Sequence, residues 1–177
     1  VVQVGGSPPG VAPAAPERLD LVKGLDSGLV AFDLATGRER WRCSSQLASY
    51  AAPVLAEIGG RPRILAWMRN DLLVVDPASG AVLAEFRWRA DELFSAIAAS
   101  PVVAGDEVLL SECYGPGSVL LDLAGGDPRL VRRDRTPRPR SSLMAHWATP
   151  IVHDGHLYGS SGRNAGDALA VCVEWKT

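Results

Sequence analysis

The sequence predicts an all-β protein, a β-propeller built from four-stranded antiparallel blades, and three observations lead to this fold class. Two different sequence patterns recur along the chain with a common period. The short apolar runs between them are separated by turn residues, and no sustained helical stripe interrupts them. A repeat of this length is one supersecondary unit, and it can bury its faces only against neighbouring copies.

The first pattern is a small residue and a proline followed by an aliphatic run. It is found three times, at 51–55, 99–103 and 148–152. The starts of these segments lie 48 and 49 residues apart. This period suits a blade of four short strands. An immunoglobulin-like sandwich has no reason to repeat at this spacing and a β-solenoid usually repeats at a shorter one, so both remain as the less favoured alternatives.

The second pattern is an aliphatic strand that ends in an aspartate and a small-residue turn. Copies of it lie at 29–37, 72–80 and, more weakly, 119–126, and a fourth copy begins at 172. In an Asp-x-x-Thr/Ser-Gly turn the carboxylate accepts hydrogen bonds from backbone amides two or three residues on, and the glycine supplies a positive φ. Further hairpin turns are predicted at 59–60, 105–106 and 154–155.

These patterns divide the chain into four predicted blades. The two complete blades are expected at 49–89 and 95–138, and the two incomplete ones at 1–43 and 142–177. Because both ends fall inside a pattern, we expect the chain to be a fragment of about three and a half blades, continued by the remaining blades of a longer chain.

Composition narrows the function classes. The chain has 177 residues, is 47% hydrophobic and carries 18 basic against 20 acidic residues, which argues against a nucleic-acid-binding domain. No apolar run approaches the roughly 20 residues of a transmembrane helix, and the first residues do not resemble a signal peptide. The three cysteines, Cys43, Cys113 and Cys172, lack the spacing of a disulfide framework or a zinc site, so we expect free thiols, half-buried in strands.

One copy of the second pattern resembles a known family motif. The segment 31–41 matches the tryptophan-docking motif of pyrroloquinoline-quinone (PQQ) repeat propellers, which reads Ala-x-Asp-x-x-Thr-Gly-x-x-x-Trp. The five matching residues are Ala31, Asp33, Thr36, Gly37 and Trp41. The resemblance implies that Trp41 packs its indole against the neighbouring blade while the turn anchors the outer hairpin. The second copy has Ala84 in the place of the tryptophan, and the third keeps only Asp122 and a Gly-Gly pair.

Families with these repeats include the PQQ-dependent alcohol dehydrogenases and the propeller lipoprotein of outer-membrane β-barrel assembly. The resemblance implies a ring of about eight blades and a periplasmic or extracellular location. The dehydrogenases hold PQQ under an adjacent Cys-Cys disulfide, with an aspartate base and Glu and Asn ligands to Ca²⁺. No two cysteines of this chain are adjacent, so we expect neither PQQ nor Ca²⁺ to bind in this stretch.

Candidate ligand contacts come from residues just before the small-Pro strands. If those strands are innermost, Tyr50, His146 and Trp147 should face the central channel, where propellers commonly bind ligands. Arg163 follows a Gly-rich loop that could hold a polar ligand. The alternative is that these side chains plug the channel or pack between blades. His146 could serve as a general base, but no nucleophile or carboxylate lies near it in sequence, so no catalytic residue is predicted.

Three further features favour a structural interpretation. His153 and His156 flank a tight Asp-Gly turn and lack further ligands in sequence, so no metal site is expected. The segment 129–140 holds six of the 18 basic residues but no aromatic residue, and is predicted to be a solvated connection between blades that prolines keep from pairing as a strand. The Pro/Ala-rich segment 7–16 is predicted to be a tolerated loop insertion.

The sequence therefore favours a non-catalytic propeller that acts as a binding or scaffolding module for a protein or a small ligand, with a protein partner on the propeller face. One alternative is part of a PQQ-dependent quinoprotein oxidoreductase whose cofactor residues lie outside this stretch. The other is a purely structural module within a longer chain.

Overall fold

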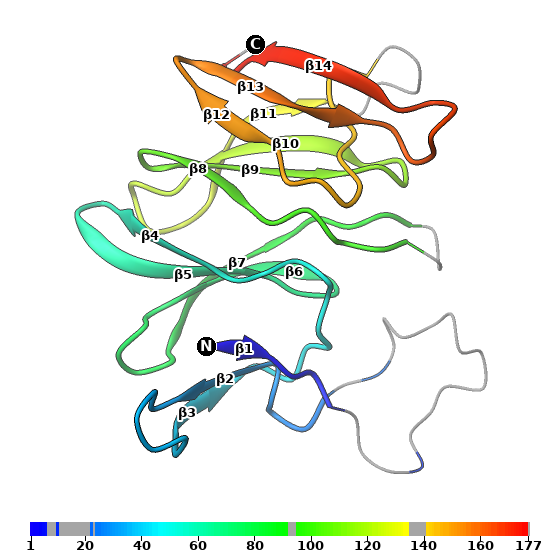
Figure 1. Cartoon of the computed structure of the whole chain (residues 1–177). Coiled ribbons are helices and arrows are strands. Elements are labelled where there is room, and N and C mark those ends of the chain that lie inside the picture. The colour runs from blue at the N-terminus through cyan, green and yellow to red at the C-terminus, as the bar shows by residue number, and fades with distance from the viewer. Residues whose placement is uncertain (7–9, 11–21, 23, 92–94, 135–140, 177) are drawn as a thin grey trace.

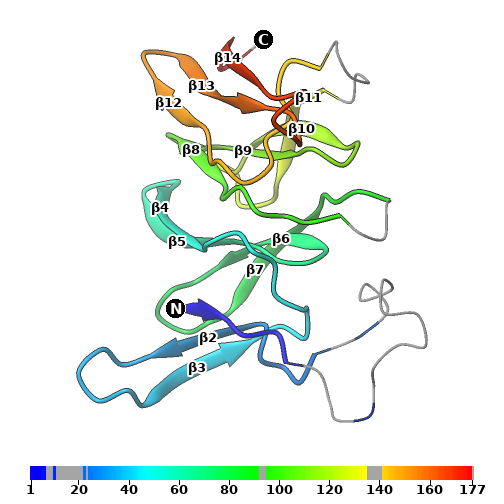
Figure 2. The same ribbon diagram turned by 45° about the vertical axis from the view of Figure 1, so that its right-hand side comes forward.

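The computed structural model describes residues 1–6, 10, 22, 24–91, 95–134 and 141–176. These residues form strands and turns and no helix, which confirms the all-β prediction. They build four antiparallel sheets that follow one another in chain order (Figure 1), and the same succession is visible in the turned view (Figure 2).

The strands of each sheet are consecutive in sequence. The first sheet contains β1 (Val2–Gln3), β2 (Leu29–Phe32) and β3 (Glu39–Cys43). The second contains β4 (Val54–Ile58), β5 (Arg61–Trp67), β6 (Asp71–Val75) and β7 (Val82–Arg87). The third contains β8 (Val102–Ala104), β9 (Glu107–Glu112), β10 (Gly117–Asp122) and β11 (Arg129–Asp134). The fourth contains β12 (Ile151–His153), β13 (His156–Ser161) and β14 (Leu169–Glu174).

The predicted hairpin turns are confirmed. Residues 59–60, 105–106 and 154–155 join β4 to β5, β8 to β9 and β12 to β13. Each turn contains residues with positive φ, supplied by glycines and, in the last turn, also by Asp154 at φ 47°. Aspartate tolerates this left-handed conformation better than most residues, which explains the Asp-Gly pair at that position.

The aspartate turns form as predicted at the ends of β2 and β6. Asp33 Oδ1 accepts the backbone N–H of Thr36 at 3.0 Å and its hydroxyl at 2.8 Å. Asp76 Oδ1 accepts the same two groups of Ser79, both at 2.8 Å. The side-chain and backbone hydrogen bonds from Thr36 and Ser79 stabilise the ionised form and hold the pKa of both carboxyls below the ordinary value.

The core lies between sheets. Along β6, Leu72 and Val74 join the apolar cluster shared with the third sheet, while Leu73 and Val75 join the one shared with the first sheet. Successive side chains of a strand point to opposite faces, so a central blade is buried on both sides by its neighbours. This is why β6 reads as a continuous apolar run.

The three small-Pro segments are linked directly to one another. The Ala52 N–H donates to Ser100 Oγ at 3.0 Å, and the Ser100 N–H donates to Thr149 Oγ1 at 2.9 Å. The bonded residues are 48 and 49 positions apart, so hydrogen bonds connect equivalent positions of successive blades. The strands that follow them, β4, β8 and β12, form the corresponding edge of each sheet.

Two expectations need correction. The basic segment was expected to be a connection, but Arg129–Asp134 pairs with β10 as β11, because its prolines lie further on and leave these backbone N–H groups free to join the ladder. Cys113 is buried in the β9–β10 turn instead of a strand, and Cys172 is exposed in β14. Residues 135–140, and 7–9 and 11–16 of the Pro/Ala-rich segment, lie outside the described residues.

Candidate functional site

The four predicted ligand contacts lie together in one cluster. The Tyr50 and Trp147 ring centroids are 5.4 Å apart, and the Trp147 and His146 centroids are 5.1 Å apart. A fifth residue, Tyr114, meets His146 edge-on at 5.4 Å, and the Arg163 guanidinium lies 4.5 Å from the centre of the Tyr114 ring. We refer to these five residues as the aromatic cluster.

The fold explains why residues so far apart in sequence meet. Tyr50 precedes β4, and His146 and Trp147 precede β12. Tyr114 lies in the β9–β10 turn and Arg163 in the β13–β14 turn. In an antiparallel sheet every second turn lies at the same end, and Figure 1 shows the β9–β10 and β13–β14 turns on one side of the stacked sheets.

The cluster has an anchored base and an exposed outer part. Tyr114 is 8% exposed, while Tyr50 is 72% and Trp147 60% exposed. A cation over a tyrosine ring is attracted by the ring quadrupole, so Arg163 helps to hold the base in place. Large aromatic side chains at this exposure offer apolar area to a partner, and tryptophan and tyrosine are enriched among residues that dominate binding energies.

Both ring nitrogens of His146 have partners. Nε2 lies 3.3 Å from the Tyr114 hydroxyl, and Nδ1 lies 3.3 Å from the backbone carbonyl oxygen of Arg163. These contacts fix the orientation of the imidazole between the two turns.

The sequence did not predict the role of Tyr114. The one feature that could have pointed to Tyr114 is its position in a turn. This turn lies at the same end of the sheets as the segments that precede β4 and β12. A sequence repeat cannot reveal this, because the β9–β10 turn of the third blade carries a tyrosine that the β5–β6 turn of the second blade lacks.

A buried carboxyl, Glu112, stands next to the turn that carries Tyr114. Its Oε2 accepts the backbone N–H of Ala90 at 3.1 Å. Burial removes this side chain from water and raises the pKa of Glu112 to about 7, although the hydrogen bonds from Ala90 and Ser95 and the nearby guanidinium groups of Arg69 and Arg89 act in the opposite direction.

The histidine pair near the β12–β13 turn makes local contacts. His156 Nδ1 lies 2.9 Å from the Asp154 carbonyl oxygen, and His153 Nε2 lies 3.2 Å from Asp154 Oδ2. Within the residues that the structure describes, no group of three or more His, Cys, Asp or Glu side chains is arranged to hold a metal ion.

The five residues of the docking motif lie at the boundary between the first and second sheets. Ala31 pairs with Trp41 across β2 and β3, next to the turn formed by Asp33, Thr36 and Gly37. The Trp41 Nε1–H donates to the carbonyl oxygen of Pro77 in the second sheet at 3.0 Å. The indole therefore contacts the equivalent turn of the next blade.

The cysteines of this chain are spaced differently from those of the quinone site in the dehydrogenases. That site requires two adjacent cysteines, whereas Cys43, Cys113 and Cys172 lie far apart in sequence, in β3, the β9–β10 turn and β14.

Antiparallel sheets of three or four described strands, which repeat every 48 or 49 residues and bury their faces against one another, define β-propeller blades. A family model described as "Outer membrane protein assembly factor BamB" matches residues 7–175, and the chain belongs to this family. No curated protein matches the chain. Among the described residues there is no helix of the length and apolar character needed to cross a membrane.

Proposed function

We propose that this propeller is a non-catalytic module that binds a protein partner through the aromatic cluster. The proposal rests on the contact between Tyr50 and Trp147. Their ring centroids lie 5.4 Å apart, the two residues come from different blades, and both side chains are more than half exposed. Such a pair offers rigid apolar faces at little cost in side-chain entropy, and the anchored base holds them in place.

The family name supports a partner within an assembly process. The matching model is named for an outer-membrane assembly factor, and we extend to this chain a scaffolding role in protein assembly and a periplasmic location. The absence of a quinone site from this stretch is part of the same proposal. Titration of the protein with PQQ, with and without Ca²⁺, tests that part, and saturable Ca²⁺-dependent binding would contradict it.

Site-specific photocrosslinking in the cell that makes the protein tests the binding surface. A photoreactive phenylalanine analogue replaces Trp147 in one variant and Leu34 in a control variant. Leu34 is fully exposed in the β2–β3 turn, at the other end of the sheets. We expect a defined crosslinked protein at position 147 that Tyr50→Ala weakens. Equal crosslinking from position 34, or none from position 147, would refute the proposal.

A further inference from the structure

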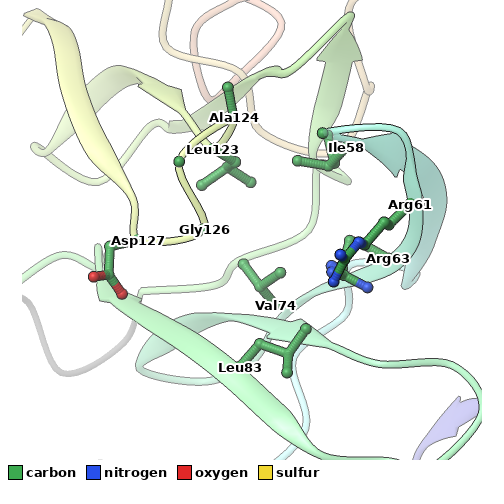
Figure 3. Close-up of a pocket in the computed structure, with 11 residues that line it drawn as sticks. Ile58, Arg61, Arg63, Val74, Leu83, Leu123, Ala124, Gly126 and Asp127 are labelled. Atoms are coloured by element: carbon green, nitrogen blue, oxygen red, sulfur yellow. The ribbon is translucent and has the colours of Figure 1, made fainter.

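A cavity of about 480 Å³ opens between the second and third sheets, at the end of the sheets opposite the aromatic cluster. Figure 3 shows its walls: the β4–β5 hairpin on one side, the β10–β11 turn on another, and side chains of β6 and β7 between them. The hydrogen bond from the Gly59 N–H to Asp106 Oδ1, at 2.7 Å, joins the β4–β5 turn to the third sheet at the edge of the cavity.

The boundary between the first and second sheets shows what fills the equivalent space. There the indole of Trp41 lies over Gly80, so closely that a Cβ atom at Gly80 would stand 2.6 Å from Trp41 Cδ2. The indole N–H donates to the Pro77 carbonyl oxygen. An aromatic ring therefore covers the aspartate turn of the next blade.

Backbone register makes Ala84 the counterpart of Trp41. Trp41 pairs with Ala31, and Ala84 pairs with Val74. In both ladders the register shifts immediately after this pair, so the two positions match even in their local irregularity. Ala84 faces the third sheet within the apolar cluster of that boundary, but its methyl group is far smaller than an indole.

The surface that the missing ring would cover is free. Gly126 stands four residues after Asp122, as Gly80 stands four residues after Asp76. A Cβ atom built on Gly126 would have no neighbour within 4 Å. The space that the protein's own indole occupies at Gly80 is thus open at Gly126, where the cavity lies.

The boundary between the third and fourth sheets fills the same position differently. Arg132, which pairs with Leu120, is the register counterpart of Trp41. Its Nη2 donates to the carbonyl oxygen of Trp175 at 3.3 Å, and this carbonyl is the counterpart of the one that Trp41 uses. In the described part of the chain, Trp41 bridges the first boundary between sheets and Arg132 bridges the third. At the second boundary the equivalent residue is Ala84, which offers only a methyl group.

The charges around the cavity favour an acidic ligand. Arg61 and Arg63 extend from β5 on one side, and Asp127 stands on the other (Figure 3). Arg63 is 3.8 Å from Asp76 and is partly neutralised, whereas Arg61 is exposed to solvent. A carboxylate beside the entering ring would find Arg61 within reach.

We propose that this cavity is a vacated docking site that receives a tryptophan side chain of a partner polypeptide with an acidic residue next to it. The entering indole covers Gly126, as Trp41 covers Gly80. Its N–H approaches the second lone pair of the Leu123 carbonyl oxygen, which already accepts the Gly126 N–H at 3.0 Å. The neighbouring carboxylate pairs with Arg61. This site is separate from the aromatic cluster, so it goes beyond the function proposed above.

Calorimetric titration with a short peptide that carries one tryptophan between glutamates tests the site. We expect saturable binding to the full chain and none by the same peptide with alanine for tryptophan. In Ala84→Trp the protein's own indole occupies the cavity. This variant should have a higher melting temperature, and its affinity for the peptide should be lower by at least about tenfold. The matched control, Ala170→Trp on an exposed position of β14, should leave binding unchanged. Unweakened binding to Ala84→Trp would overturn the proposal.

A charge reversal at the rim gives a second test that does not depend on how well the core accepts a new ring. Arg61→Glu should lower the affinity for the acidic peptide by about three- to tenfold, because it replaces an attraction between opposite charges by a repulsion between like charges. Arg133→Glu, at an exposed position of β11, is the control and should have no effect. Equal affinity of neutral N-acetyl-tryptophanamide and the acidic peptide would overturn the assignment of an acidic partner segment.

Discussion

Replacement of Glu112 by glutamine tests the physical account of the buried carboxyl beside the aromatic cluster. Burial raises the pKa of this side chain from the ordinary value of 4.5 to about 7. Below pH 4.5 the group is protonated in both the folded and the unfolded chain, so it has no effect on their balance. As the pH rises, the unfolded chain releases the proton first, and the free energy of unfolding falls until the pH has passed 7.

The size of the effect follows from the two pKa values. A separation of this size is worth ~3 kcal/mol at 25 °C, since each pH unit corresponds to about 1.4 kcal/mol. Glutamine is neutral at every pH and keeps an oxygen that can accept the Ala90 N–H. Glu112→Gln should therefore gain stability over the wild type as the pH rises, by ~2–3 kcal/mol between pH 5 and pH 8.

Urea unfolding followed by tryptophan fluorescence, at several pH values from 5 to 8, measures this difference. Other titrating groups, including the three histidines, cancel when the variant is compared with the wild type at each pH. Glu85→Gln, at an exposed position of β7, is the control and should give a flat difference. A flat difference for Glu112→Gln as well would refute the raised pKa and the burial that causes it.

Three further predictions concern docking, turn geometry and thiol exposure. Trp41→Ala should lower the free energy of unfolding by about 2 kcal/mol in urea titrations, whereas Trp147→Ala, at a mostly exposed ring, should change it by less than about 0.5 kcal/mol. Gly80→Ala should cost more stability than Gly60→Ala, since both have positive φ but only the new methyl at 80 meets an indole; equal costs in the same titration would contradict the packing. Cys172 should react with a thiol reagent in the folded protein while the two buried cysteines stay unmodified until it unfolds, and a count of modified thiols by mass spectrometry checks this.

Local chemistry made the strands and turns predictable. The alternation of side chains along a strand and the capture of backbone amides by Asp33 and Asp76 involve residues a few positions apart, so they are visible in the sequence. The basic segment was misassigned for the opposite reason. Whether Arg129–Asp134 pairs depends on β10 being available at its side, which its own composition does not reveal.

The candidate site shows the same division. The sequence supplied Tyr50, His146, Trp147 and Arg163 one by one, because each lies beside a repeat marker or a turn. Their meeting, and the part played by Tyr114, follow from turns of different blades that share one end of the sheets.

By itself the sequence determined the repeat, the four sheets and the turns that separate their strands, since periodicity and turn chemistry act over a few residues. It also marked Ala84 as the position where the docking tryptophan is missing. Only the tertiary structure decided the consequence, because the contacts between blades join residues dozens of positions apart. At one boundary Arg132 fills the gap across a distance that no local pattern encodes, and at the other the space over Gly126 stays open.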